Sequence, residues 1–215
     1  DLDDTTVTAR SDNDFSVSET AEVWTQVPFV VNWLDGFEGG WNAWTTDVLR
    51  VSNPNPTNWE VGDPSPFGAG PGPAYNGTNC SGTNIVDWYY DNADNIFVTP
   101  YVEIGVAPQI LSFYHWYDTN DWGWGADGGF VELSVSGGPW NRIAPIGGYP
   151  YVGGNFGGYG GDGYSGNSAG WQYQEFDLTT WAGQVVQARF HFGSNGGGMP
   201  GWYVDDVYMG TPPYR

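Results

Sequence analysis

Positive charge is scarce in this chain of 215 residues. Lysine and arginine together number 5, all of them arginine, against 25 aspartate and glutamate residues, so the formal net charge is -20. Nucleic acids and anionic membranes are bound through basic patches that offset negative charge. The composition therefore argues against both classes of partner and favours cations.

Long apolar stretches are also missing. No run of 18 or more apolar residues occurs, so the sequence contains no candidate membrane-spanning helix. The chain opens on Asp1, without an initiator methionine and without a charged and then apolar leader segment. We interpret this start as that of a processed, exported protein, and the expected location is extracellular.

Cysteine and histidine are too few for several kinds of site. Cys80 is the single cysteine, so no intrachain disulfide can form and the fold must rest on its core and any bound metal. Zinc is not favoured, because Cys80, His115 and His191 are widely spaced in the sequence. Asn76 and Asn79 each begin a glycosylation triplet, but such triplets are too common by chance to predict a modified site.

Glycine and aromatic residues are abundant instead. The chain has 34 Gly, 15 Pro, 13 Trp, 14 Tyr and 11 Phe, and no segment shows a sustained helical period. This pattern predicts one all-β domain, an antiparallel two-sheet β-sandwich of short aromatic strands joined by Gly/Pro turns. The strands are expected at residues 23–33, 96–103, 109–117, 129–136, 171–176, 185–192 and 202–209.

Two of these segments predict different environments. Residues 130–135 alternate, so the face with Phe130, Glu132 and Ser134 is expected to be wet and the opposite face to pack in the core. Residues 109–117 are apolar at nearly every position, which is typical of a central strand covered on both sides.

Three segments stand apart from the strands. Residues 1–34 are predicted to be an N-terminal extension that precedes the sandwich at 35–215. Residues 53–84 are rich in Asn, Pro and Gly, and residues 147–170 are rich in Gly and Tyr, so both are predicted to be long loops. Taken alone, the Gly/Tyr stretch is typical of flexible low complexity.

The order of short motifs along the chain resembles a known family. It is similar to the MAM-like jelly-roll modules that follow the catalytic domain of immune inhibitor A type peptidases, and to the choice-of-anchor or cleaved-adhesin modules of secreted bacterial proteins. The motifs are DGFEGGW (35–41), WEVG (59–62), GPAYNGTN (72–79), HWYD (115–118), DGGFVELS (127–134), FDL (176–178), RFHFGS (189–194) and WYVDDV (202–207).

This resemblance implies a jelly-roll topology, often with a structural calcium ion. The family's peptidase activity belongs to a separate domain with a His-Glu-x-x-His motif, which this chain lacks. The chain departs from the family at residues 1–34, which precede the usual start of the module, and at the long aromatic loop 147–170. We expect the protein's specific function to lie in these additions.

The adjacent carboxylates Asp205 and Asp206 interrupt an apolar, aromatic strand. Neighbouring side chains of a strand point to opposite faces, so one of the two must share the face of Val204 and Tyr208, where an unpaired charge is unfavourable. With few arginines available, a bound cation is expected. The calcium ligands that the resemblance implies are Glu38, Asp118, Asp127, Asp205 and Asp206, and the alternative is that these acids are solvated turn residues.

Catalysis is not expected. Residues 166–170 fit the Gly-x-Ser-x-Gly pattern around Ser168, but a nucleophile elbow needs an apolar strand before it and a helix after it. Here a Gly/Tyr loop precedes the motif and a strand follows it. His115 and His191 lie in aromatic strands, where a structural role is more common than that of a base.

Aromatic loop residues are the remaining candidates. They could stack on sugar rings or pack against another protein, and the alternative for Trp122 and Trp124 is that they cap the end of the sandwich. The predicted set is Trp122, Trp124, Tyr149, Tyr151, Phe156, Tyr159 and Tyr164.

Two functions fit these observations. The first is a calcium-stabilised structural or adhesive protein that self-associates into a filament, with residues 1–22 pairing with the next subunit as a donor strand. The competing role for residues 1–22 is to complete the edge of their own sheet. The second function is a carbohydrate-binding or accessory module of a secreted hydrolase, whose partner would be a polysaccharide.

Overall fold

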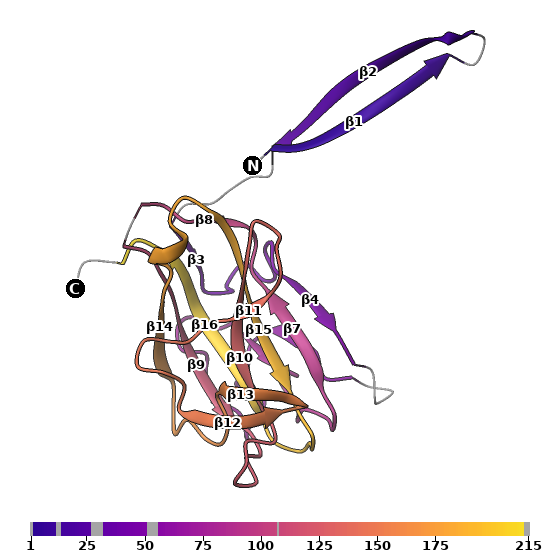
Figure 1. Cartoon of the computed structure of the whole chain (residues 1–215). Helices are drawn as coiled ribbons and strands as arrows, with labels where there is room; N and C mark the ends of the chain where they lie inside the picture. Colours follow the sequence, from indigo (N-terminus) through magenta and orange to yellow (C-terminus); the bar gives the residue numbers. More distant parts are fainter. Residues whose placement is uncertain (1, 12–13, 27–31, 51–55, 107, 213–215) are drawn as a thin grey trace.

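The protein is an antiparallel β-sandwich with a separate N-terminal hairpin (Figure 1). The computed structural model describes residues 2–11, 14–26, 32–50, 56–106 and 108–212, and for the first two ranges it describes the backbone alone. Two 6-stranded sheets form the sandwich. The predicted all-β, two-sheet antiparallel architecture is therefore confirmed.

The chain crosses between the two sheets several times, so neighbouring strands in each sheet come from distant parts of the sequence. Sheet I has the order β11-β10-β15-β7-β4, with β8 paired to β15, and sheet II has the order β14-β9-β16-β6-β5, with β3 paired to β16. Sheet I comprises β4 (Thr45–Val48), β7 (Asp94–Val98), β8 (Val102–Glu103), β10 (Gly128–Val135), β11 (Asn141–Arg142) and β15 (Val185–Gly193). Sheet II comprises β3 (Trp33–Asp35), β5 (Trp59–Gly62), β6 (Cys80–Thr83), β9 (Ile110–Asp118), β14 (Gln172–Asp177) and β16 (Gly201–Gly210).

Most of the predicted strands are present. The segments 109–117, 129–136, 171–176, 185–192 and 202–209 correspond to β9, β10, β14, β15 and β16 within two residues, and 96–103 is divided between β7 and β8. The segment 23–33 is divided between the end of β2 and the start of β3, while its residues 27–31 lie outside the described residues. The sequence patterns missed β5 and β6, which lie inside the segment predicted as the loop 53–84; residues 53–55 of that segment also lie outside the described residues.

Aromatic side chains fill the space between the sheets. The ring of Trp59 on β5 stacks on Phe97 of β7 at 5.4 Å, and Trp202 of β16 meets Phe190 of β15 at 5.6 Å. All four side chains are at most 1% exposed. Burying each aromatic ring stabilises the fold by about 1.5–3 kcal/mol, so this cluster ties the two sheets together.

The outer face of sheet I is covered by a second hairpin, which corrects two predictions. Strands β12 (Tyr151–Phe156) and β13 (Tyr159–Gly163) pair with each other inside the segment predicted as a flexible loop. Phe156 and Tyr159 pack on Phe130, with ring centroids 6.3 and 5.9 Å apart. The face of β10 expected to be wet, with Phe130, Glu132 and Ser134, is therefore buried.

Glycine allows this hairpin to lie close to the sheet. A Cβ at Gly163 would lie 2.5 Å from Cε2 of Phe156 and 2.7 Å from the carbonyl oxygen of Gly129. Cβ atoms do not approach other atoms so closely, so a larger residue here would push the hairpin outward. Gly163 is therefore required by the close packing of the hairpin on the sheet.

The N-terminal strands do not join the sandwich. Strands β1 (Leu2–Ser11) and β2 (Asp14–Gln26) pair antiparallel with each other, and within the described strands neither belongs to sheet I or sheet II. Among the described strands, β1 and β2 therefore do not complete an edge of the sandwich, contrary to the alternative. Their side chains, including the Thr6, Thr8, Phe15 and Val17 pattern, lie outside the description.

The single helix of the described residues is a short 3-10 turn, η1 (Thr179–Trp181), between β14 and β15. No helix in this part of the chain is long and apolar enough to cross a membrane.

Candidate functional site

The predicted carboxylates of β16 lie at a β-bulge. The pairing of β16 with β9 shifts register between Asp205 and Tyr208, and Asp206 adopts a φ of 47°. The extra residue breaks the alternation that places neighbouring side chains on opposite faces. As a result Val204 and Val207 both belong to the core, and the predicted grouping of Val204 with Tyr208 on one face is wrong.

Asp205 is a buried carboxylate held by backbone amides. Its side chain is 0% exposed, the backbone N–H of Asn76 donates to Oδ2 at 3.0 Å, and that of Asp206 donates to Oδ1 at 2.7 Å. Burial raises its pKa to about 7, although these hydrogen bonds favour the ionised form. Burial also raises the pKa of Asp206, and Glu38 contributes to that rise.

Glu38 approaches the same corner from the chain segment before β4. Its Oε1 accepts the backbone N–H groups of Thr78 at 2.9 Å and Asn79 at 2.7 Å. A Cβ at Gly77 would lie 2.5 Å from that oxygen, and a Cβ at Gly36 would lie 2.8 Å from Oδ1 of Asp206. Both glycines therefore allow the backbone to pass close to a carboxylate.

We call Glu38, Asn76, Asp205 and Asp206 the acidic corner. The side-chain amide of Asn76 donates to Asp206 at 3.4 Å, which ties the loop before β6 to the bulge. The donors here are carboxylate and amide oxygens, the ligands that calcium takes in sets of six to eight. Within the described residues, however, no three acidic, histidine or cysteine side chains converge on one point, so a calcium ion would also need backbone carbonyl oxygens.

Asp118 and Asp127 lie away from the acidic corner. Asp118 pairs with Gly201 at the beginning of β16, four residues and therefore about 13 Å before Asp205. Asp127 is fully buried, and it accepts hydrogen bonds from the Tyr89 hydroxyl at 2.8 Å and the Asn195 backbone at 2.6 Å. These two carboxylates do not share a site with Asp205, because the length of β16 separates them.

Most of the predicted aromatic ligand residues are structural. Tyr149, Phe156 and Tyr164 are between 0% and 9% exposed and belong to the core, and Tyr151 packs against it while remaining half-buried. Tyr159 is half-buried as well, and its hydroxyl donates to Asp94 at 2.9 Å. The β12–β13 hairpin turns Phe156 and Tyr159 toward sheet I, which corrects the prediction for these two rings, whereas Tyr164 follows the hairpin and packs on His115 and Trp202.

Trp122 and Trp124 are exposed, as a contact surface requires. Their side chains are 55% and 44% exposed, and their rings lie 6.1 Å apart at an interplanar angle of 43°. A Cβ at Gly196 would lie 2.5 Å from the Trp122 ring, so that ring rests on the loop before β16. This packing agrees with the cap at the end of the sandwich that the sequence offered as the alternative.

A second aromatic surface was not predicted. We call Tyr75, Tyr114, Trp171 and Tyr173 the aromatic strip, which lies on the outer face of sheet II. Tyr75 stacks on Tyr114 with centroids 3.5 Å apart and an angle of 10°, Tyr173 lies 5.2 Å from Tyr114, and Trp171 lies 6.2 Å from Tyr75. Tyr75 and Tyr173 are each 43% exposed.

The strip was missed because its members come from distant parts of the sequence. Alternation along β9 and β14 places Tyr114 and Tyr173 on the outer face, which could have been read from the strands. Tyr75 arrives on the loop before β6, and no local pattern relates it to Tyr114. Trp171 is fixed by its indole N–H, which donates to the carbonyl of Pro73 at 3.3 Å.

Ser168 is occupied by backbone contacts. Its hydroxyl accepts the N–H of Tyr117 at 3.0 Å and lies 3.2 Å from the carbonyl oxygen of the same residue. This pairing fixes the loop before β14 against β9. The hydroxyl therefore acts as a connector between two segments, which agrees with rejection of the Gly-x-Ser-x-Gly match.

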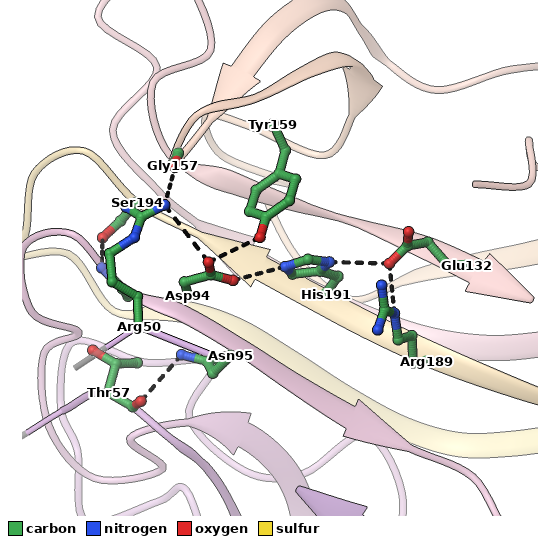
Figure 2. Close-up of polar contacts among 11 residues, drawn as sticks. Arg50, Thr57, Asp94, Asn95, Glu132, Gly157, Tyr159, Arg189, His191 and Ser194 are labelled. Carbon is green, nitrogen blue, oxygen red and sulfur yellow. Dashed lines mark hydrogen bonds and ion pairs between the residues drawn. The ribbon is translucent and has the colours of Figure 1, made fainter. Parts of the chain in front are cut away.

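His191 lies in a chain of buried charges on the outer face of sheet I (Figure 2). Its Nδ1 is 3.0 Å from Glu132 Oε2 and its Nε2 is 2.9 Å from Asp94 Oδ1. The ring therefore bridges two carboxylates through its two nitrogens. Arg189 donates to Glu132 at 2.6 Å, and Arg50 lies 3.6 Å from Asp94, which completes the chain.

This network joins the hairpin to sheet I. Tyr159 of β13 donates to Asp94, and Arg50 donates to the carbonyl of Gly157 at 2.8 Å (Figure 2). Both ring nitrogens of His191 are engaged with buried carboxylates. His191 is therefore a structural residue, as the sequence predicted.

The two-sheet sandwich is similar in fold to a solved cleaved-adhesin domain. The K3 cleaved adhesin domain of Lys-gingipain from Porphyromonas gingivalis superimposes with a TM-score of 0.50 at 17% identity, over 85% of this chain and 99% of that domain. The predicted resemblance to cleaved-adhesin modules is thus confirmed at the level of the fold.

Sequence similarity links the chain to parts of two peptidases. It is 28% identical over 174 residues, 80% of its length, to Bacillopeptidase F of Bacillus subtilis, and 50% identical over 46 residues to the pre-pro-metalloprotease PrtV of Vibrio cholerae. The matched regions span 10% and 5% of those proteins. No protein-family model matches the chain.

Proposed function

We propose that this chain is a non-catalytic carbohydrate-binding accessory module of an extracellular protein, and that the aromatic strip is its binding platform. The observation that carries the proposal is that the exposed Tyr75 and Tyr173 and the half-buried Trp171 lie close together around Tyr114 on one sheet face. Aromatic faces stack on the apolar C–H faces of sugar rings, while the edges of such a patch stay wet. The similarity to parts of secreted peptidases supports an accessory role outside the cell.

Charge narrows the class of sugar. The net charge of -20 disfavours an acidic polysaccharide through repulsion. The strip itself contains only tyrosine and tryptophan. We therefore propose a neutral polysaccharide that lies across β14 and β9.

Affinity electrophoresis in gels that contain neutral polysaccharides tests the strip. Wild-type protein should be retarded by at least one neutral polymer, and Trp171→Ala and Tyr173→Ala should each lose most of the retardation, because each removes one stacking face. Trp122→Ala is the matched control, since it removes an equally exposed indole at the end of the sandwich. Retardation that depends on Trp122 and is unchanged in the strip variants would contradict the proposal.

We also propose that calcium binds at the acidic corner. The support is chemical, because Asp205 and Asp206 lie together at the bulge, Glu38 is held nearby by the loop before β6, and no salt bridge joins Asp205 to an arginine among the described residues. When bound, the ion would supply positive charge that favours the ionised form of Asp205. It would also link the loop before β6 to β16, next to Tyr75 of the strip.

A second candidate function is self-association through the N-terminal hairpin. Strands β1 and β2 are 10 and 13 residues long and pair with each other. An isolated two-stranded hairpin is marginally stable in water, and its two free edges can pair with a strand of another chain. This supports the filament hypothesis, with the hairpin as the element that leaves its own sandwich to contact a neighbour.

A further inference from the structure

A cleft opens beside the edge strand β14, between residues of β9 and β14 and the loop segment 146–150, and Tyr173 of the aromatic strip is also among its lining residues. Its volume is about 390 Å³, within the range of small-molecule sites. One wall is β14 and the other is the segment from Ile146 to Pro150, where Gly147 and Gly148 adopt φ values of 90° and 84°. Residues with a Cβ rarely adopt these angles, so the glycines allow the turn that forms the rim.

Tyr164 lies at the base of this cleft with an unused hydroxyl. It is 1% exposed, and its Oη is buried without a hydrogen-bond partner among the described residues. The ring is held by its neighbours, with centroids 4.4 Å from His115, 4.9 Å from Tyr149 and 5.6 Å from Trp202. A buried hydroxyl without a partner is unfavourable for folding, so it requires an explanation other than stability.

His115 adds a donor of fixed orientation. The indole N–H of Trp202 donates to its Nδ1 at 3.2 Å, so Nδ1 is an acceptor and the proton of the neutral ring is on Nε2. Burial lowers the pKa of His115 to about 3, which keeps the ring neutral at physiological pH. The base of the cleft therefore includes a neutral imidazole and a phenol whose rings lie 4.4 Å apart.

The remaining lining is polar and uncharged. Gln172 and Gln174 belong to β14, and Asn167 and Ser168 lie on the loop before it, while no aspartate, glutamate, lysine or arginine of the described residues lines the cleft. Uncharged amides and hydroxyls around aromatic rings are suited to a ligand that carries many hydroxyl groups and no charge. An ionised ligand would lose its hydration here without gaining an opposite charge.

We propose that this cleft is a second binding site, which takes one neutral sugar unit, either free or at the end of a chain, with a ligand hydroxyl paired to Tyr164 Oη. The inference rests on the cleft alone and does not require the aromatic strip. A sugar on the strip would lie across the outer face of sheet II, whereas a sugar in the cleft would enter beside the edge strand β14.

The test uses the full chain and a panel of neutral sugars, namely glucose, galactose, mannose and N-acetylglucosamine, measured by saturation-transfer NMR and titration. At least one should bind, and Tyr164→Phe should weaken it about tenfold, because one hydrogen bond is lost. The melting temperature of Tyr164→Phe without sugar should equal or exceed that of the wild type. Gln174→Ala, at the wall, gives a second variant that leaves the core intact.

Trp171→Ala is the control that separates this site from the strip. Binding lost in Tyr164→Phe and Gln174→Ala but kept in Trp171→Ala supports the cleft. Binding lost only in Trp171→Ala overturns the cleft and leaves the strip standing. The proposal is also overturned if no panel sugar binds, if only an uncharged peptide binds, or if Tyr164→Phe melts lower than the wild type, since the hydroxyl would then serve the fold.

Discussion

Calcium should stabilise this protein more at neutral pH than in acid, and Asp205 determines the size of the difference. Burial raises the pKa of its folded-state carboxyl to about 7 from 3.8. Between about pH 4 and pH 7 the folded state then holds a proton that the unfolded chain releases. Without a cation, the contribution of Asp205 to stability therefore falls as pH rises through this window.

The magnitude follows from the size of the shift. A change from 3.8 to about 7 is about 3 pKa units, which at 1.36 kcal/mol per unit is at most roughly 4 kcal/mol. An ion that favours the ionised carboxylate would remove this penalty. The difference in free energy of unfolding between calcium and chelator should therefore be near zero at about pH 4 and approach roughly 4 kcal/mol by about pH 8.

Thermal melts with calcium and with a chelator, recorded from about pH 4 to about pH 8, measure this difference. For a chain of this length, roughly 4 kcal/mol corresponds to a Tm increase of about 8–16 °C. Asp205→Asn removes the titrating group, so it should lose the pH dependence of the calcium effect. Asp118→Asn is the matched control, because it alters a half-buried acid at the far end of β16.

The reasoning would be refuted by a calcium effect of the same size at both ends of the pH range. It would also be refuted if calcium left the melting curve unchanged at about pH 8, or if Asp118→Asn abolished the effect while Asp205→Asn kept it.

Three further predictions follow from contacts described above. Burial alone would raise the pKa of Glu132, but the hydrogen bonds to His191 and Arg189 outweigh burial and lower it, so the stability that Glu132 adds is lost as the pH falls through the lowered pKa. Glu132→Gln should reduce the free energy of unfolding by about 3–5 kcal/mol in denaturant titrations. A loss under about 1 kcal/mol would contradict a buried network. Purified protein should show no peptidase, esterase or glycosidase activity, and an activity abolished by Ser168→Ala would show that the Gly-x-Ser-x-Gly match had been dismissed wrongly. Deleting residues 1–26 should leave a protein that sediments as a monomer and has an unchanged thermal melting curve, because β1 and β2 pair only with each other among the described strands. Unfolding of the shortened protein, or filaments that persist, would exclude the hairpin as the donor element.

Sequence alone predicted the long strands because their patterns are local. Segments such as 185–192 alternate between core and outer side chains, and this period is a property of the strand itself. The resemblance of ordered motifs then predicted a sandwich of the observed class. The hairpin of β12 and β13 was missed because glycine has no side chain with which to show a period.

The environment of a strand could not be read from the strand alone. Glu132 was expected to face water, yet it is bound by Arg189 and His191, which lie 57 and 59 residues further along the chain. At Asp205 and Asp206 the alternation rule fails because a bulge inserts one residue. The resemblance to the family nevertheless predicted that the acids of β16 and Glu38 lie near each other, and the structure places Glu38 close enough to Asp206 to affect its pKa.

The covering of sheet I by the β12–β13 hairpin makes the module asymmetric. One broad face is closed by a hairpin held through Asp94, Arg50 and Tyr159, while the other carries exposed rings. If the module is joined to further domains, these can pack against the closed face without hiding the open one. The hairpin would then determine which face of a tethered module is covered and which face presents the aromatic surface to solvent.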